Sequence, residues 1–277
     1  MPPTPLVVRH NFFVSADSDQ LNYKGEVLTL LLEKSKARFG PYVLEKSPQA
    51  GWSQNRTYRE LGQGHLDVIS SMTNQTREAI SIPIRYCLYK GLLGVRIGMG
   101  SKTSVRKFNA ITTWDALTQV NFGLVFDWPD YAIQTDAGLK VLRLPALESS
   151  IVRVKRGTFD LLPMGIVEVG ALAKKHDLAT ISTWAIAYPT AYYFFVSKTR
   201  PELAQRLEYG FEQALKDQSF EHLFAKRIGP LLADASLENR QIFYLKNPYL
   251  PKETPLQRKE LWHPLVLQQL QETQGKL

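Results

Sequence analysis

Arg77 is the side chain of this 277-residue sequence best suited to bind a small anion. Its guanidinium presents a planar fork of donors, which can hold a carboxylate through two parallel hydrogen bonds when water is excluded. The alternative is a surface arginine at a helix start, although first turns prefer acidic residues to basic ones. We expect that replacing Arg77 with Ala weakens carboxylate binding and leaves folding nearly unaffected.

A second candidate binding residue is Trp128. Asp127 is suited to cap a helix and Pro129 to occupy its first turn, which would hold Trp128 beside free backbone amides at the helix start. There Trp128 could form an apolar or stacking wall for a ligand. Because tryptophan is mostly buried in proteins, packing inside its own domain is an equal alternative.

Further candidates follow or lie in predicted strands. Arg9 and Asn11 lie at the end of the first strand, and open α/β sheets bind ligands beyond the carboxyl ends of their strands. The alternative to ligand binding is that these side chains form a structural ion pair or are exposed to solvent. Tyr188 and Tyr193 lie in an aromatic stretch and could line a cleft. Strand alternation sends only some of these aromatic side chains to any one face.

Residues with nucleophilic, metal-binding or redox chemistry are scattered. The segment 94–103, GVRIGMGSKT, lacks the Gly-Lys-Ser/Thr order of a phosphate loop, and no GxSxG or HExxH pattern occurs. Cys87, the only cysteine, is expected to be a buried thiol. The five histidines are far apart: His10, His65, His176, His222 and His263. We therefore predict no catalytic residue, no metal site and no cofactor, and a binding protein rather than an enzyme.

The composition is that of an ordinary globular protein, with 44% hydrophobic and 22% charged residues. The net charge of +8 favours anionic partners weakly, but basic and acidic residues are interspersed and no basic run or RNA-binding aromatic box occurs. We expect no nucleic acid partner. No stretch of 18 apolar residues is present to span a membrane.

The elements that must position these residues alternate between strand and helix, which is typical of parallel α/β sheets. In the first part of the chain we predict strands at 6–13, 42–45 and 66–70 and helices at 21–38 and 57–61. In the middle we predict strands at 122–126, 140–144 and 159–162 and helices at 113–118, from Pro129, at 149–155 and at 166–176. A helix at 200–216 follows, and the tail after Arg240 is predicted to be poor in strands.

Two apolar stretches are predicted to pass between two bodies. Residues 86–98 contain three glycines, and residues 185–197 are rich in aromatic and β-branched side chains. One body would then contain both ends of the chain and the other its middle section.

Three motifs resemble the family 3 extracellular solute-binding proteins of amino-acid ABC transporters. Gly64-His65-Leu66-Asp67 followed by Thr73-Asn74-Gln75-Thr76-Arg77 is similar to the family's G-x-x-D and its Thr-rich turn ending in Arg. Residues 156–160, RGTFD, resemble the G-R-x-D of the second lobe, and residues 192–203 resemble the family's Tyr, Lys and Pro-Glu-Leu pattern. The resemblance spans residues 6–228.

The chain also resembles a proteobacterial subgroup of that family. Its W-P-D turn, F-D-x-x-P-R-G strand end and N-P, T-P-L and Trp tail are similar to residues 127–130, 159–165 and 247–262. Met164 departs from this pattern, because the subgroup has an arginine there. A cationic contact from the second lobe is therefore expected to be missing.

The resemblance implies an α/β fold of the two-lobed type II periplasmic binding protein class, with two doubly wound sheets joined by two crossover strands. Lobe 1 would comprise residues 1–95 and 190–277, and lobe 2 residues 96–189. A small polar or charged solute, amino-acid-like or a carboxylate, would be captured between the lobes for transport. Seven residues are predicted to bind it: Arg77, Thr76, Thr73, Trp128, Arg9, Asn11 and Tyr193.

The same resemblance implies a monomer that works with a membrane permease or a sensor protein. The resemblance also implies a periplasmic location. Met1-Pro2-Pro3-Thr4-Pro5 has neither the basic nor the apolar region of a secretory signal, so we expect the signal segment to lie outside this sequence. The alternatives are a ligand-sensing domain of a signalling protein and an enzyme on the same fold.

Overall fold

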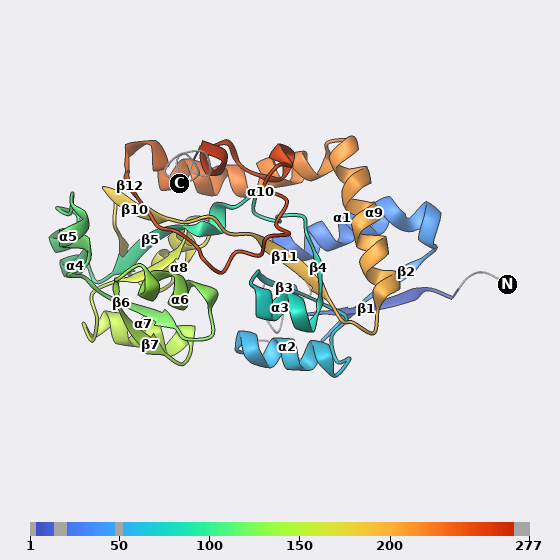
Figure 1. Cartoon of the computed structure of the whole chain (residues 1–277), viewed down its shortest axis with the longest axis horizontal. Coiled ribbons are helices and arrows are strands. Elements are labelled where there is room, and N and C mark those ends of the chain that lie inside the picture. The colour runs from blue at the N-terminus through green and yellow to red at the C-terminus, as the bar shows by residue number, and fades with distance from the viewer. Residues whose placement is uncertain (1–3, 14–20, 48–51, 269–277) are drawn as a thin grey trace. The chain divides into compact units, whose positions relative to one another are not determined.

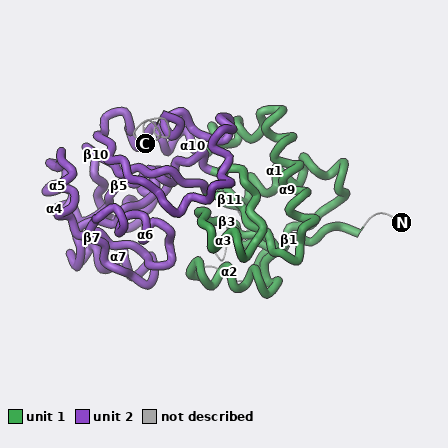
Figure 2. The backbone as a smooth tube through the Cα atoms, viewed as in Figure 1, with its two compact units in different colours: residues 1–88, 192–227 green, residues 89–191, 228–277 purple. Residues whose placement is uncertain are grey.

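A computed structural model describes residues 4–13, 21–47 and 52–268 and divides the chain into two compact units (Figure 1). Unit 1 comprises residues 1–88 and 192–227, and unit 2 comprises residues 89–191 and 228–277 (Figure 2). Each unit combines segments that are far apart in the sequence.

Unit 1 contains five strands and four complete helices among its described residues. The strands are β1 (Leu6–His10), β2 (Tyr42–Lys46), β3 (Val68–Met72), β4 (Ile82–Ile84) and β11 (Tyr192–Val196). The helices are α1 (Tyr23–Phe39), α2 (Gln54–Gly62), α3 (Gln75–Ile80) and α9 (Pro201–Lys216).

The strands of unit 1 form two sheets joined by a backbone hydrogen bond. β1 and β2 are parallel, and β3, β11 and β4 form an antiparallel sheet in that order. The Asp67 backbone N–H, just before β3, donates to the Arg9 carbonyl at 3.0 Å and brings β3 beside β1. The start of β3 therefore lies beside the end of β1.

Unit 2 contains most of the remaining elements. Its strands are β5 (Val95–Gly100), β6 (Asn121–Val125), β7 (Lys140–Leu144), β8 (Leu162–Gly165), β9 (Ala179–Thr180), β10 (Trp184–Ala187) and β12 (Gln241–Tyr244). Its helices are η1 (Leu92–Gly94), α4 (Lys102–Phe108), α5 (Trp114–Leu117), α6 (Pro129–Asp136), α7 (Leu147–Lys155), α8 (Val169–Lys175), η2 (Leu237–Asn239) and η3 (Lys259–Leu261). α10 (Ser219–Ala235) begins in unit 1 and ends in unit 2.

The strands of unit 2 pair in the order β12, β10, β5 and β8, with β9 also on β5, while β6 and β7 form a parallel pair. The Gly123 N–H in β6 donates to the Leu161 carbonyl at 3.0 Å, which links this pair to the start of β8. Each sheet draws its strands from one unit only.

Local sequence explains why the main helices begin where they do. The Asn22 side chain accepts from the backbone N–H groups of Lys24 and Gly25 at the start of α1. Pro129 and Pro201 occupy the first positions of α6 and α9, as predicted. The prediction that Asp127 caps α6 is wrong. Trp128 occupies the N-cap position of this helix, and its side chain makes no capping hydrogen bond.

Three features of the predicted organisation differ from the structure. The stretch 185–197 is not one strand: it breaks around Pro189 into β10 of unit 2 and β11 of unit 1. The tail 228–277, expected in lobe 1, belongs to unit 2, because β12 pairs in parallel with β10. The chain also passes between the units a third time, within α10.

Close packing of α1 on α9 in unit 1 depends on a glycine. A Cβ on Gly210 would lie 2.3 Å from the backbone oxygen of Leu31, which cannot move aside as a flexible side chain could. We expect Gly210→Ala to lower the free energy of unfolding by about 1 to 3 kcal/mol in urea denaturation. Gly170→Ala in α8 is the control, since its Cβ would meet nothing within 4 Å. An unchanged midpoint for Gly210→Ala would contradict this packing.

Candidate functional site

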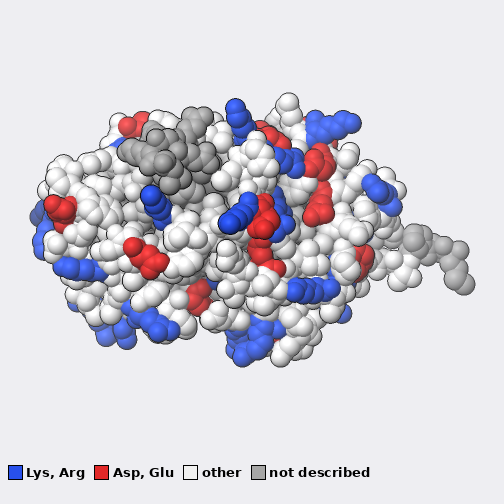
Figure 3. All heavy atoms as spheres, viewed as in Figure 1, with Lys and Arg blue, Asp and Glu red and all other residues white. Residues whose placement is uncertain are grey.

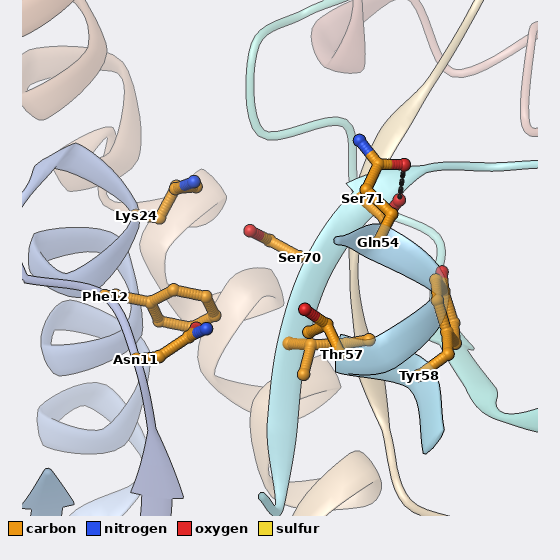
Figure 4. A pocket seen from close by; sticks show the side chains of 9 residues that line it. Asn11, Phe12, Lys24, Gln54, Thr57, Tyr58, Ser70 and Ser71 are labelled. Atoms are coloured by element: carbon orange, nitrogen blue, oxygen red, sulfur yellow. Dashed lines mark hydrogen bonds between the residues drawn. The ribbon is translucent and has the colours of Figure 1, made fainter. Parts of the chain in front are cut away.

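A polar pocket of about 130 Å³ lies in unit 1 where β1, α1, α2 and β3 meet. Figure 4 shows the end of β1 and the start of α1 on one side, and α2 and β3 on the other. The pocket is lined by nine residues: Asn11, Phe12, Lys24, Gln54, Thr57, Tyr58, Ile69, Ser70 and Ser71. Hydroxyls, amides, one ammonium and two aromatic rings therefore surround a space of small-molecule size.

Lys24 lies between two aromatic rings of unit 1. Its Nζ is 5.9 Å from the ring centroids of both Phe12 and Tyr192. The Tyr192 hydroxyl donates to the Ser70 carbonyl at 3.2 Å, which ties this ring to the β3 side of the pocket. Figure 4 shows the Lys24 side chain and the Ser70 hydroxyl extending toward the pocket from opposite sides.

Arg77 lies directly behind the pocket wall and is buried. Its Nη1 donates to the Ser71 hydroxyl at 2.5 Å and to the Met72 carbonyl at 2.8 Å, and its Nη2 donates to Gln54 Oε1 at 2.5 Å. The alternative of a surface arginine is therefore wrong. Arg77 orients two of the polar groups that line the pocket.

The surroundings of Arg77 are themselves buried and ordered by hydrogen bonds. The Tyr58 ring lies 5.3 Å from the Arg77 guanidinium carbon, and burial raises the pKa of Tyr58, so its hydroxyl stays neutral. The Thr73 hydroxyl donates to Glu78 Oε1 at 2.6 Å, and Arg85 bonds the other Glu78 oxygen at 2.5 Å. Thr73 thus supports the turn before α3.

The structure brings only part of the predicted binding set together. Asn11 lines the pocket, and Arg77 and Thr73 lie behind or beside its wall. Thr76 is exposed on α3, and Tyr193 is fully buried inside β11, so neither lines this pocket. Whether any of these residues binds a ligand stays a prediction.

Arg9 and Trp128 lie elsewhere. Arg9 Nη1 is 3.9 Å from Asp67 and donates to the Gly64 carbonyl at 3.2 Å, which is the structural ion pair that the sequence left open. Trp128 is half-buried in unit 2. Tyr188, also in unit 2, is completely buried and donates its hydroxyl to Asp130.

Sequence reasoning missed most of the pocket. Phe12, Lys24, Gln54, Thr57, Tyr58, Ile69, Ser70 and Ser71 were not among the predicted residues. One signal was available: Lys24 is the second residue of α1, where a cation is disfavoured by the positive end of the helix dipole. A basic residue in an unfavourable position is a candidate for a functional role.

His10, next to Asn11, makes the stability of unit 1 depend on pH. Its Nδ1 accepts the Phe12 N–H at 3.1 Å, its ring stacks on Phe13, and burial lowers its pKa to about 4. Between pH 6.5, the ordinary histidine pKa, and about pH 4, this histidine is protonated in the unfolded chain but neutral in the folded chain. The free energy of unfolding therefore decreases as the pH falls through this range.

We expect this histidine to account for up to about 3 kcal/mol of that loss, from the pKa difference at about 1.4 kcal/mol per unit. His10→Asn keeps an acceptor for the Phe12 N–H and should flatten the dependence in urea denaturation between pH 7 and 4. His222→Asn, at an exposed position, is the control. Equal pH dependence in wild type and His10→Asn would contradict a buried neutral imidazole.

Charged side chains and potential metal ligands are dispersed among the described residues. On the face that Figure 3 shows, basic and acidic side chains are interspersed. Within residues 4–13, 21–47 and 52–268, no group of three His, Cys, Asp or Glu side chains could hold a metal ion. In those same ranges no helix has the length and hydropathy needed to cross a bilayer.

Comparisons with known proteins identify the fold. No family model matches the chain, and no curated protein matches it. A periplasmic binding protein of Salmonella typhimurium with high arginine specificity superposes with a TM-score of 0.61 at 12% identity, over 80% of this chain and 99% of its own. A ligand-binding core from Nostoc punctiforme, solved with L-glutamate, matches with a TM-score of 0.55 at 12% identity, over 82% and 100%.

A histidine kinase sensor domain with similarity to periplasmic binding proteins also matches, with a TM-score of 0.52 at 14% identity, over 81% of this chain and 96% of its own. At such low identities the likeness establishes the fold and leaves the ligand open. The chain has the α/β fold of type II periplasmic binding proteins, which confirms the predicted fold class.

Proposed function

We propose that this protein is a solute-binding protein that captures a small polar or charged molecule, amino-acid-like or a carboxylate, for transport across a membrane. The observation that carries the proposal is the polar pocket of unit 1, with Arg77 fixing Gln54 and Ser71 in its wall. Preformed polar groups around a small cavity are the usual design of such sites.

Two further observations support a binding role. The described pocket lining offers amides, hydroxyls and an ammonium, all suited to hydrogen bonding with a small polar ligand. The structures that share the fold include proteins whose ligands are arginine and glutamate. We infer a periplasmic location and a membrane permease as partner from the same likeness.

A thermal-shift screen tests this function. Amino acids, small carboxylates and polyamines are added at millimolar concentrations, and a true ligand raises the free energy of unfolding by about 2.7 kcal/mol at one hundred times its Kd. Ser70→Leu, which fills the pocket, should abolish the shift while its melting temperature without ligand stays near that of wild type. A screen without any shift, or shifts that survive Ser70→Leu, would reject the unit 1 pocket as the binding site.

A sensing role is the second candidate, and the likeness to a histidine kinase sensor domain is the observation that favours it. Transport and sensing both begin with ligand binding to this protein. They differ in the partner protein that recognises the ligand-bound form. A kinase or cyclase encoded beside the gene supports sensing, whereas a permease supports transport. Recovery of the bound ligand as an altered product after incubation would instead indicate an enzyme.

A further inference from the structure

The charge of the unit 1 pocket is unbalanced. Among the described residues that line it, Lys24 carries a full charge and the other eight are neutral. Arg77 adds a second cation directly behind the wall, in contact with Gln54 and Ser71. A small pocket whose described lining has one ammonium and no carboxylate, with a second cation behind its wall, favours an anion and opposes a cation.

Lys24 is held differently from other lysines of the same helix. Lys34 forms an ion pair with Asp217, and Lys36 lies 3.7 Å from Glu33. Within the described part of the chain Lys24 contacts the Phe12 and Tyr192 rings and has neither an ion pair nor a hydrogen bond from its ammonium. Aromatic rings orient a cation without neutralising it, so Lys24 keeps its charge available for a ligand.

The place of Lys24 along α1 has an energetic cost. It is the second residue after the Asn22 cap, and a cation there opposes the helix dipole. An anion bound beside Lys24 would remove this unfavourable interaction and would also be attracted by the helix start. The bound state therefore relieves an electrostatic cost that the empty pocket retains.

We propose that Lys24 selects an anionic ligand. The protein binds a small molecule that presents a carboxylate or similar anionic group to Lys24. It discriminates against uncharged isosteres and against basic amino acids. The inference rests on the proposed binding function and specifies its substrate class. It distinguishes this chain from the structurally similar protein of Salmonella typhimurium, whose described specificity is for arginine.

Matched pairs of compounds that differ in charge but hardly in shape give the sharpest test. Isothermal titration measures L-glutamate against L-glutamine, L-aspartate against L-asparagine, and succinate against succinamate, with L-arginine as the cationic probe. Wild type is expected to bind the anionic member of at least one pair at least about 10-fold more tightly and to bind L-arginine more weakly than either member, because Coulomb attraction acts only on the charged form.

Lys24→Met should lower the affinity for that anionic compound by about 10- to 100-fold and leave its uncharged partner within about 3-fold, since only the anion loses a charged partner. Lys36→Met, on the same helix with the same change of charge but outside the pocket, is the control and should match wild type. Lys24→Glu should reverse the preference toward L-arginine.

The outcomes separate the two proposals. If wild type binds members of the panel but treats both members of each pair alike, or prefers L-arginine, the inference about Lys24 is overturned and the binding function stands. A Lys24→Met variant that weakens both members of a pair equally overturns it as well. If no compound binds wild type, the binding function itself fails and the inference fails with it.

Discussion

Replacing Arg77 with Ala is expected to weaken ligand binding by about 1 to 3 kcal/mol, because Gln54 and Ser71 of the pocket wall lose the hydrogen-bond donor that orients them. Its loss frees these two side chains of the pocket wall. Arg77→Lys should recover only part of the affinity, because an ammonium cannot bond Gln54, Ser71 and the Met72 carbonyl in the geometry of the planar fork.

Arg77→Ala should also reduce stability, which revises the expectation from sequence that folding is nearly unaffected. The buried Met72 carbonyl loses the donor that Arg77 supplies, at a cost of about 1 to 3 kcal/mol. Binding is measured by titration calorimetry well below the melting temperature of each variant. Arg59→Ala, at an exposed position in α2, is the control. Equal affinities for wild type, Arg77→Lys and Arg77→Ala would reject Arg77 as a site residue.

Replacing Asp130 with Asn is expected to lower the free energy of unfolding by about 3 to 5 kcal/mol, because it leaves a buried arginine without its carboxylate. Asp130 pairs with Arg96, and both are almost completely buried in unit 2. Tyr188 donates to Asp130, and Gln134 Nε2 donates to the Tyr188 hydroxyl at 3.3 Å. Burial alone lowers the pKa of Arg96, but the negative charges of Asp130 and Glu168 raise it on balance, so the guanidinium stays protonated.

Urea denaturation of three variants measures this pair. The double variant Arg96→Met/Asp130→Asn should recover much of the loss, since an uncharged core has no unpaired ion to desolvate. Asp177→Asn is the control: Asp177 pairs with Lys102 on the surface, at 3.4 Å with both side chains mostly exposed, and should cost less than about 1 kcal/mol. A loss below about 1 kcal/mol for Asp130→Asn would show that the pair is not essential to unit 2.

Local elements were predictable because their signals are local. Strand β7 matches the predicted range 140–144, and α9 begins one residue after the start of the predicted helix 200–216. Val27, Leu28 and Leu31 have the spacing of one face of the predicted helix 21–38, and all three are buried in α1. These signals are helical periodicity, strand alternation and proline geometry. Each depends only on residues that are close together in the chain, so each can be recognised in a single sequence.

The partners of distant segments were less predictable. The tail 228–277 was assigned to the wrong body, because the pairing of β12 with β10 joins residues about 57 positions apart and leaves no periodic trace in either strand. The break at Pro189 was missed for a related reason: 185–197 reads as one apolar run, although its halves enter different sheets. Strand pairing depends on what the rest of the chain offers.

By itself the sequence determined the alternating α/β elements and the fold class, since periodicity and motif order carry that information. Only the tertiary structure decided that Arg77 is buried behind the wall and that Lys24 faces the pocket. The pocket is assembled from residues 11–12, 24, 54, 57–58 and 69–71, and these converge only when β1, α1, α2 and β3 pack together. A binding site is a property of that convergence, because the charges and hydrogen bonds that select a ligand act through space rather than along the chain.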